Sequence, residues 1–465
     1  MKKRFNWFKN WYPVSPIDYL EKKKPNTIEL LNKKLVVWKN YLGDWIVMDD
    51  ICPHKLVELS KGKIDLSAEN IVCRYHGWHF NSSGKCTQIP AFYKEDFSQK
   101  NICEDKQAMV KTYPSLVSQD LLWIWPDNSP VAEIESKSSQ PAIMPEDLVD
   151  ISDINWYMTE VPIGYAISVE NTFDPFHAPF VHENENELVE NKIFPIKQYE
   201  LISEISSEGF TLKQSGFNNR NKDIETKRKF VSPCSNTVVY NFPNGQKKLF
   251  QVYFIPTKPG YCKTIVQLLP FTNLRKKTFW QRFLPEDLVI GLQHISFYKM
   301  SDQDLNILNS QEAAYSKIDQ SSSEACYLPT TSDVGSKVFR NWLEEFAGGE
   351  PFKKETHFEV LSDEKLYERW HKHSKFCPHC RNSLKILEKI RIIADWSSRV
   401  LGLLSLITLL ISMVFANNNG IFFKIALLLA ILTWFCFWFS IYLEDKKHLF
   451  LSSIPKHKLP EIQLY

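Results

Sequence analysis

With 465 residues, of which 44% are hydrophobic and 14% aromatic, the chain is too long for a single hydrophobic core, and two or three folded units are expected. Its formal net charge of +2, without an RNA- or DNA-binding motif, argues against a nucleic-acid partner. The ten cysteines form no short disulfide framework, which indicates a reducing compartment for the soluble part.

The N-terminal part has the pattern of a small antiparallel β-domain. Residues 1–13 are charged and aromatic without an apolar stretch, so they predict neither a secretory signal peptide nor a transit peptide. From Lys34 onward, short apolar runs alternate with glycines as far as the run 121–126, which is typical of short strands joined by turns. We place this domain at residues 1–130, followed by a linker at 131–150 that is rich in Ser, Pro, Asp and Glu.

Two short Cys/His motifs lie inside this domain. Cys52 and His54 are followed, after eighteen residues, by Cys73 and His76. Two thiolates on one iron and two imidazoles on the other can hold a Rieske-type [2Fe-2S] cluster, which accepts electrons and passes them on. The same four donors could instead build a zinc site. The residues around them, in the stretches CPH and CRYHGW, favour the cluster.

A second metal site is predicted in the domain that we place at 151–365. His177 and His182 stand five positions apart, and two histidines with one carboxylate can bind iron(II) while leaving positions open for dioxygen and substrate. The best-placed carboxylate is Asp304, in a helical run that is expected to begin near Asp302. Asp302 itself lies on another face of that run and is the rival ligand.

Two polar residues precede these histidines in the sequence. Asp174 is expected either to fix the tautomer of a ligating imidazole or to bridge to a cluster histidine and carry electrons between the two sites. Asn171 is expected near the iron, with its role left open. Further along, another helix is expected from about Asp333 to Phe346.

The C-terminal part changes character abruptly. Residues 400–416 are uncharged, and residues 420–443 contain a single charge. At a rise of about 1.5 Å per residue, both stretches can span a hydrocarbon core of about 30 Å. We therefore predict two transmembrane helices within 399–443 and a tail at 444–465. Lysines and arginines flank the pair, and the loop 417–419 is uncharged, which predicts that the catalytic domains and both ends of the pair face the cytoplasm.

The segment 366–398 contains Cys377 and Cys380, which form a Cys-x-x-Cys pair. Three histidines lie nearby: His371, His373 and His379. With these donors the pair could bind zinc. It could also act as a redox switch that closes to a disulfide, or consist of inert thiols.

The motifs together resemble the Rieske non-haem iron oxygenases. More narrowly, the chain is similar to their membrane-anchored branch, which contains pheophorbide a oxygenase, chlorophyllide a oxygenase and the Rieske proteins associated with import at the plastid envelope. The resemblance covers nearly the whole chain, through residues 10–14, 52–64, 73–91, 171–182, 304–312, 338–343, the Cys377/Cys380 pair and the two terminal spans.

This resemblance implies an α+β protein with an all-β Rieske domain, a helix-grip (START-like) catalytic domain and a C-terminal transmembrane helical hairpin. It also implies a homotrimer, in which the cluster of one subunit feeds the mononuclear non-haem iron of the next through Asp174. Asp304 falls where the third iron ligand of the family lies. Reduced ferredoxin would supply the electrons, and the Cys377/Cys380 pair would respond to thioredoxin.

We therefore predict a membrane-bound Rieske monooxygenase that uses dioxygen and ferredoxin electrons to oxygenate a chlorin such as pheophorbide a or chlorophyllide a. The alternative is a non-catalytic redox sensor or assembly factor, whose marker would be a damaged iron triad. The many Lys, Asn and Ile residues favour a cyanobacterial or similar bacterial source, and hence a thylakoid or plasma membrane.

Overall fold

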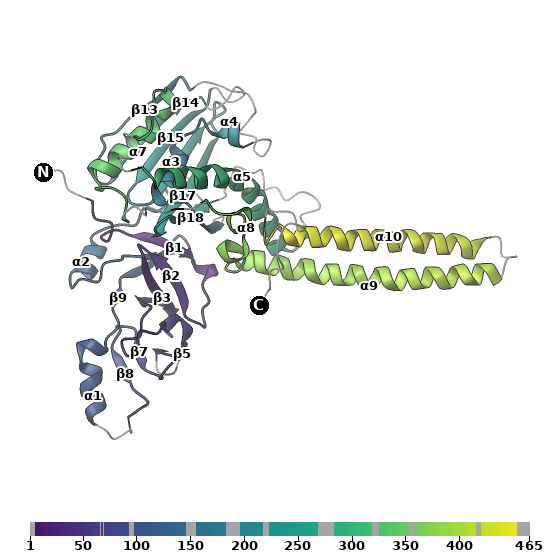
Figure 1. Ribbon diagram of the computed structural model, residues 1–465, viewed down its shortest axis with the longest axis horizontal. Helices are drawn as coiled ribbons and strands as arrows, with labels where there is room; N and C mark the ends of the chain where they lie inside the picture. Colours follow the sequence, from purple (N-terminus) through teal and green to yellow (C-terminus); the bar gives the residue numbers. More distant parts are fainter. Residues whose placement is uncertain are drawn as a thin grey trace. The chain divides into compact units, whose positions relative to one another are not determined.

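The structure is a computed structural model, and it divides the chain into two compact units (Figure 1). Unit 1 consists of residues Met1–Lys276 and Gln303–Val360, and unit 2 of residues Lys277–Asp302 and Leu361–Tyr465. The described residues are 5–65, 67, 69–92, 97–145, 155–182, 196–216, 223–267, 283–318, 325–352, 358, 360–414 and 420–452. The end of the predicted linker, the predicted loop 417–419 and the end of the predicted tail lie outside them.

Unit 1 begins with an all-β part built of three antiparallel sheets. The sheet orders are β1-β11-β10, β2-β3-β4-β9 and β5-β6-β7-β8. The strands are β1 (Tyr12–Pro16), β2 (Asn26–Leu30), β3 (Lys33–Lys39), β4 (Trp45–Asp49), β5 (Lys63–Asp65), β6 (Asn70–Val72), β7 (His79–Asn81), β8 (Cys86–Gln88), β9 (Thr112–Tyr113), β10 (Ser115–Ser118) and β11 (Leu121–Ile124). Helical pieces join them: η1 (Ile17–Tyr19), η2 (Leu59–Lys61), α1 (Phe97–Glu104), η3 (Lys106–Ala108) and α2 (Ala132–Lys137).

The core of this part lies between the second and third sheets. Trp38 and Met48, from β3 and β4, share one buried cluster with Phe80 from β7. Cys52 and Cys73 belong to the same cluster. The apolar residues that make the strands therefore also anchor the two cysteines of the predicted cluster site.

The second part of unit 1 is centred on a seven-stranded antiparallel sheet of order β12-β18-β17-β16-β15-β14-β13. Side chains of β15 alternate between exposed and buried from Glu225 to Phe230, as expected for a sheet with one covered face. The strands are β12 (Trp156–Val161), β13 (Gln198–Leu201), β14 (Gly209–Ser215), β15 (Glu225–Val231), β16 (Ser235–Asn241), β17 (Lys247–Lys258) and β18 (Tyr261–Gln267).

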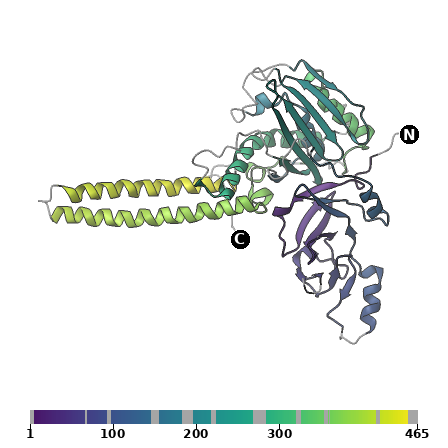
Figure 2. The same cartoon turned by 180° about the vertical axis from the view of Figure 1, so that it is seen from behind.

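Two helices, α3 (Tyr165–Phe173) and α7 (Val334–Glu345), pack against each other and against this sheet (Figure 2). Between them, the rings of Phe173 and Phe339 stack 5.9 Å apart. The Arg340 guanidinium donates two hydrogen bonds to the Glu170 carboxylate, at 2.8 and 2.7 Å. The stretch 338–343 thus supplies both the apolar contact and the ion pair that hold α3. The helix expected from about Asp333 to Phe346 agrees with α7.

Helix α5 (Glu286–Tyr315) begins sixteen residues before the predicted start near Asp302, so that boundary was wrong. Pro285 precedes the helix, and Glu286 and Asp287 occupy its first turn. Carboxylates in a first turn interact favourably with the free N–H groups of a helix start. Among the described residues, unit 1 also contains the single turn α4 (Ala178–Val181) and η8 (Thr331–Asp333).

Unit 2 contains the two long C-terminal helices, which run side by side in both views (Figures 1 and 2). They are α9 (Pro378–Val414) and α10 (Ile421–His448), preceded by α8 (Asp363–Leu366) and by η9 (Trp370–Ser374), a π-helical turn. Both long helices are apolar enough to cross a membrane, with mean hydropathies of 1.8 and 2.2. The Ser405 hydroxyl donates to the Ala426 carbonyl oxygen at 2.8 Å, which joins the two helices.

Candidate metal centres

The two Cys/His motifs lie on two loops of the all-β part. Cys52 and His54 follow β4, and Cys73 and His76 lie in the turn between β6 and β7. The Cys73 N–H donates to the Trp78 carbonyl oxygen at 2.9 Å, which closes the second loop. Both cysteines are buried, whereas both histidines are exposed, with their ring centroids 4.6 Å apart. The structure therefore brings all four predicted ligands to one end of this part, with the sulfur atoms inside and the imidazoles at the surface.

The electrostatics of this group fit an iron–sulfur cluster. Burial, together with neighbouring Cys73, raises the pKa of the Cys52 thiol to about 12. A buried thiolate therefore needs a bound cation, and coordination to a metal deprotonates a thiol outright. Partial desolvation and neighbouring His76 lower the pKa of His54, so its imidazole is neutral near pH 7, as a metal ligand requires.

His177 and His182 are placed by the way α3 ends. Pro175 disfavours helical geometry at the residue before it, and Asp174 leaves the helix with φ −101° and ψ 89°. The chain then forms α4, a single turn with His177 at its N-cap and His182 at its C-cap. The two imidazoles face each other across this turn, with ring centroids 5.4 Å apart.

Asp304, on α5, completes this group. Its carboxylate oxygens lie 3.6 Å from Nε2 of His177 and 3.5 Å from Nε2 of His182, and the three ligand atoms are close enough to hold one metal ion. Burial raises the pKa of Asp304, while the two imidazoles and a hydrogen bond from Asn171 lower it. Asn171 thus contacts the predicted third ligand. The rival, Asp302, instead forms an ion pair with Arg369.

The second ring nitrogen of each histidine has its own acceptor. His177 Nδ1 donates to the backbone carbonyl oxygen of Asp174, and His182 Nδ1 contacts Gln303 Oε1 at 3.3 Å. Both contacts fix a tautomer that leaves Nε2 free to bind metal. The tautomer of His177 is therefore set by the carbonyl of Asp174 and not by its carboxylate, which is half-buried and accepts the Phe176 N–H at 3.0 Å.

The role of Gln303 was missed in the sequence. Nothing in its immediate neighbourhood distinguishes it from an ordinary polar helix residue. Its function depends on α5 lying beside the loop that carries His182, which is a tertiary fact.

A third group of donors surrounds the Cys-x-x-Cys pair. Cys377 and Cys380 lie with His294 and His373, and all four side chains are buried. The other two neighbouring histidines point elsewhere: His371 Nδ1 lies 3.2 Å from Glu368 Oε1, and His379 Nδ1 lies 2.7 Å from Asp287 Oδ1. His294 is not among the predicted donors, because it precedes the pair by more than eighty residues in the chain.

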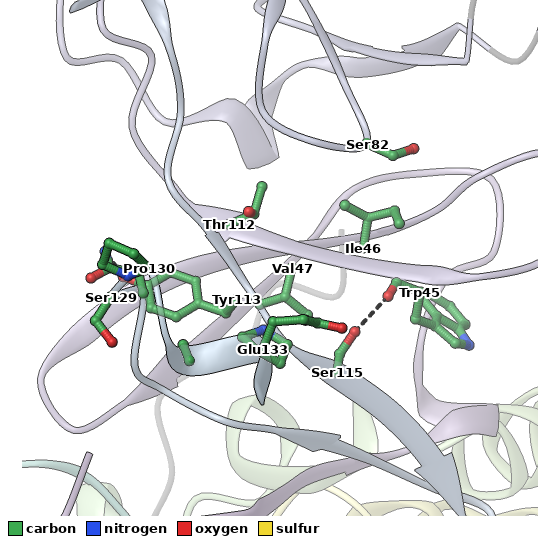
Figure 3. A pocket seen from close by; sticks show the side chains of 13 residues that line it. Trp45, Ile46, Val47, Ser82, Thr112, Tyr113, Ser115, Ser129, Pro130 and Glu133 are labelled. Carbon is green, nitrogen blue, oxygen red and sulfur yellow. Dashed lines mark hydrogen bonds between the residues drawn. The ribbon is translucent and has the colours of Figure 1, made fainter. Parts of the chain in front are cut away.

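A pocket of about 340 Å³ lies in the all-β part (Figure 3). It is lined by Trp45, Tyr113 and Glu133, and by Ser115, whose hydroxyl donates to the Trp45 carbonyl oxygen at 2.8 Å. Among the described residues, no member of the three donor groups lines it. This pocket is therefore separate from the metal chemistry.

Comparison with protein families gives two matches. Residues 10–114 match the Rieske [2Fe-2S] domain, and residues 230–322 match pheophorbide a oxygenase. The first range contains all four predicted cluster ligands, on the loops after β4 and β6. The second contains Asp304.

Individual relatives match over most of the chain. Flavonoid 8-hydroxylase 2, chloroplastic, of Ocimum basilicum is 30% identical over 412 residues, which cover 84% of this chain and 76% of the relative. Pheophorbide a oxygenase, chloroplastic, of Oryza sativa subsp. japonica is 29% identical over 420 residues, which cover 83% of this chain and 75% of the relative. Among solved structures, Pseudomonas putida CBB5 NdmB has a TM-score of 0.53 at 18% identity, covering 73% of this chain and 91% of that one, a likeness of fold.

Proposed function

The chain belongs to the Rieske oxygenases that carry a pheophorbide a oxygenase domain, and from this premise we propose that it oxygenates a chlorin at an iron held by His177, His182 and Asp304. The observation that carries the proposal is the meeting of these three side chains, from two distant segments, around one position. The family carries a [2Fe-2S] cluster and a mononuclear iron, and we assign the cluster to Cys52, His54, Cys73 and His76.

The two cofactors supply electron storage and a site at which dioxygen is activated. The chain's own residues prepare the second site. Asp174 and Gln303 hold the two imidazoles with Nε2 turned toward the metal position. Asn171 donates to Asp304 and orients its carboxylate. Two imidazoles and one carboxylate would hold an iron ion and would leave coordination positions open for dioxygen and substrate.

We assign Asp174 the further role of bridging residue between the two centres. Its carboxylate is half-buried on the loop beside His177, and only one of its oxygens accepts the Phe176 N–H. The exposed imidazoles of His54 and His76 are the natural contact for such a bridge. In this proposal the protein is a homotrimer, the bridge joins neighbouring subunits, and reduced ferredoxin is the electron donor.

The substrate class rests on two observations. Residues 230–322 match the pheophorbide a oxygenase domain, which favours a chlorin such as pheophorbide a or chlorophyllide a. The apolar helices α9 and α10 would hold the enzyme at a bilayer, where such a pigment partitions. We further propose that the seven-stranded sheet and the helices packed against it form a helix-grip domain. The Rieske domain would then span residues 1–130 and the catalytic domain residues 151–365.

The rival function, a non-catalytic redox sensor or assembly factor, would need no intact iron site. Here the three ligand atoms lie together, and both imidazoles have an orienting acceptor. Such support has no purpose in a protein that only stores an electron. The geometry therefore favours the enzyme.

The test uses the full chain, purified in detergent, with reduced ferredoxin and isotopically labelled dioxygen. Pheophorbide a, chlorophyllide a and a flavone are supplied in turn. We expect oxygen uptake coupled to one labelled oxygen atom in a chlorin product, and none with His182→Ala. The exposed residue His371, changed to Ala, is the matched control and should retain activity.

Two results would count against parts of the proposal. Labelled product from the flavone only would retain the oxygenase and overturn the chlorin assignment. Reduction of the cluster by ferredoxin without oxygen uptake on any of the three compounds would favour the sensor.

A further inference from the structure

The four residues around the Cys-x-x-Cys pair come from three separate segments of unit 2. His294 lies on α5, His373 on the π-helical turn η9, and the two cysteines at the start of α9. The cysteines, His294 and His373 are each fully buried, with 0% exposure. Four potential metal donors that converge from three segments in a buried interior are unusual unless an ion binds there, because burial removes each of these groups from water and an ion compensates that cost.

The distances between their donor atoms match a single tetrahedral ion. His294 Nδ1 lies 3.3 Å from Cys380 Sγ and 3.6 Å from Cys377 Sγ, and His373 Nε2 lies 3.3 Å from Cys380 Sγ. Nitrogen and sulfur bound to zinc at about 2.05 and 2.3 Å in a tetrahedron lie about 3.5 Å apart. The observed separations fall on both sides of this value.

We propose that Cys377, Cys380, His294 and His373 form a structural zinc site, independent of both iron centres. Four protein donors fill a tetrahedral coordination shell, which is the arrangement of structural zinc and leaves no position for a substrate. Binding replaces the two thiol protons with the metal ion, so up to two protons are released when zinc enters.

Two cysteines and two histidines could also bind a two-iron cluster, as we propose for the N-terminal loops. In such a cluster the thiolates bind one iron and the imidazoles bind the other, so nitrogen and sulfur donors do not share an ion. Here both kinds of donor lie within 3.6 Å of each other. The group therefore fits a mononuclear ion, and a sulfur–nitrogen donor set of tetrahedral geometry selects zinc.

The contacts around the four residues support a fixed geometry. The Cys380 backbone N–H points to Cys377 Sγ at 3.5 Å, as the free N–H groups of a helix start do toward a thiolate. The Tyr298 ring packs edge-on against His373, at 5.3 Å and 88°, and the Arg369 guanidinium covers Tyr298 at 3.9 Å. Arg369 also pairs with Asp302, which explains the place of that carboxylate.

The same burial argues against an exchangeable dithiol. A redox switch must expose at least one sulfur to a partner that attacks it. Both sulfur atoms here are enclosed, and both have imidazole nitrogens beside them. The site instead joins the N-terminal part of α5, the π-helical turn and the start of α9.

The experiment measures zinc and iron per chain in the full-length protein, purified in detergent from cells grown with added zinc. We expect one zinc ion per chain, released when a mercurial reagent modifies the thiols. His373→Ala and Cys380→Ser should lose this zinc and keep their iron. The matched control is His371→Ala, two residues from His373 on the same turn, which should keep both metals. Cys234→Ser, an equally buried cysteine in no donor group, should also keep both.

Iron content and cluster absorbance report whether each variant folds. Should the variants fail to fold, the zinc content of the unmodified chain still decides the matter. Zinc well below one per chain, with no uptake of added Zn²⁺ by the reduced protein, would overturn the proposal. Retention of zinc in both His373→Ala and Cys380→Ser would do so too. Neither result bears on oxygen uptake at the iron. The zinc proposal and the proposed oxygenase function can therefore fail independently.

Discussion

At the scale of single residues, the mononuclear site depends on which ring nitrogen of each histidine is occupied. A backbone carbonyl at Asp174 serves His177, and a side-chain amide at Gln303 serves His182. The first partner is built into the loop and survives any substitution at position 174 that keeps its backbone. The second can be removed by mutation, so it offers a direct test.

We expect Gln303→Met to weaken iron binding by about 10–100-fold, because the loss of an orienting partner for a metal-ligating histidine has that typical effect. Methionine keeps the length of the side chain but cannot accept the His182 N–H. Gln303→Glu keeps the acceptor and should bind iron as the unmodified chain does. Iron retention against a graded series of chelator concentrations measures the difference, and equal retention in both variants would refute the orienting role.

The identity of the third ligand is also decided at this scale. Asp304→Asn should lose one iron per chain and reduce oxygenation to background, since a neutral amide is a poor substitute for the carboxylate that completes the triad. Asp302→Asn keeps an acceptor for Arg369 and should retain all its iron. The iron content of the two variants, measured relative to the absorbance of the cluster, distinguishes Asp304 from Asp302 as the ligand. The opposite pattern would make Asp302 the ligand.

At the scale of elements, the ligand loops are held by the strands and helices on either side of them. Helix α3 ends where Arg228 Nη1 donates to the Thr172 carbonyl oxygen at 2.8 Å and the Tyr199 hydroxyl donates to the Phe173 carbonyl oxygen at 3.0 Å. These donors satisfy the free carbonyl groups of the helix end. The loop that carries His177 therefore starts from a fixed point.

The ion pair between Arg340 and Glu170 holds the same helix from its other side. Arg340→Met should lower the free energy of unfolding, by up to about 3–5 kcal/mol, because it leaves the mostly buried Glu170 carboxylate without its partner. Lys337→Met, on the exposed face of α7, is the control and should change stability little. Thermal unfolding of the two variants provides the comparison, and similar shifts in both would mean that the pair contributes little.

The loop that carries Cys73 and His76 requires an unusual backbone conformation at Gly77. This residue has φ +70°, and a β-carbon placed on it would lie 3.0 Å from Cγ of Pro90. Gly43 also has a positive φ, +97°, but its nearest neighbour would be 3.9 Å away. Both Gly→Ala changes should cost about 1–2 kcal/mol of backbone strain. Only Gly77→Ala should also reduce cluster occupancy, measured by absorbance per chain. Full occupancy in that variant would show that the loop yields.

At the scale of the whole molecule, the chain combines a β-rich, metal-binding unit with a unit dominated by two long apolar helices. Most side chains in the apolar parts of α9 and α10 are exposed. Both helices are long and apolar enough to span a membrane, which is the environment that we propose for them.

A chain that ends after Arg399 should therefore stay in the soluble fraction, whereas the full chain should sediment with membranes and resist extraction by alkaline carbonate. Because the proposed ligands of the cluster and of the iron all precede residue 399, the truncated chain should keep its iron. Fractionation with iron analysis of both chains tests this. Release of the full chain by carbonate would contradict the membrane assignment.

Much of this protein follows from its sequence alone, because its ligands come in short motifs. Cys52 with His54, Cys73 with His76, and His177 with His182 are each close in the chain, so local spacing already predicts the donor sets. The two terminal helices were predicted from composition, since a long uncharged apolar stretch has few alternatives. The start of α5 was misplaced, although Pro285 before the helix and the two carboxylates of its first turn mark a helix start.

Only the tertiary structure could bring together residues that are distant in the chain. Asp304 and Gln303 reach His182 across more than a hundred residues, and His294 reaches Cys377 across more than eighty. Such contacts depend on how α5 packs, and packing is set by the summed burial of many side chains rather than by any local pattern. For that reason the sequence predicted most donors of the two proposed iron sites, whereas the fold decided which carboxylate lies beside His177 and His182 and which histidines lie beside the buried cysteines.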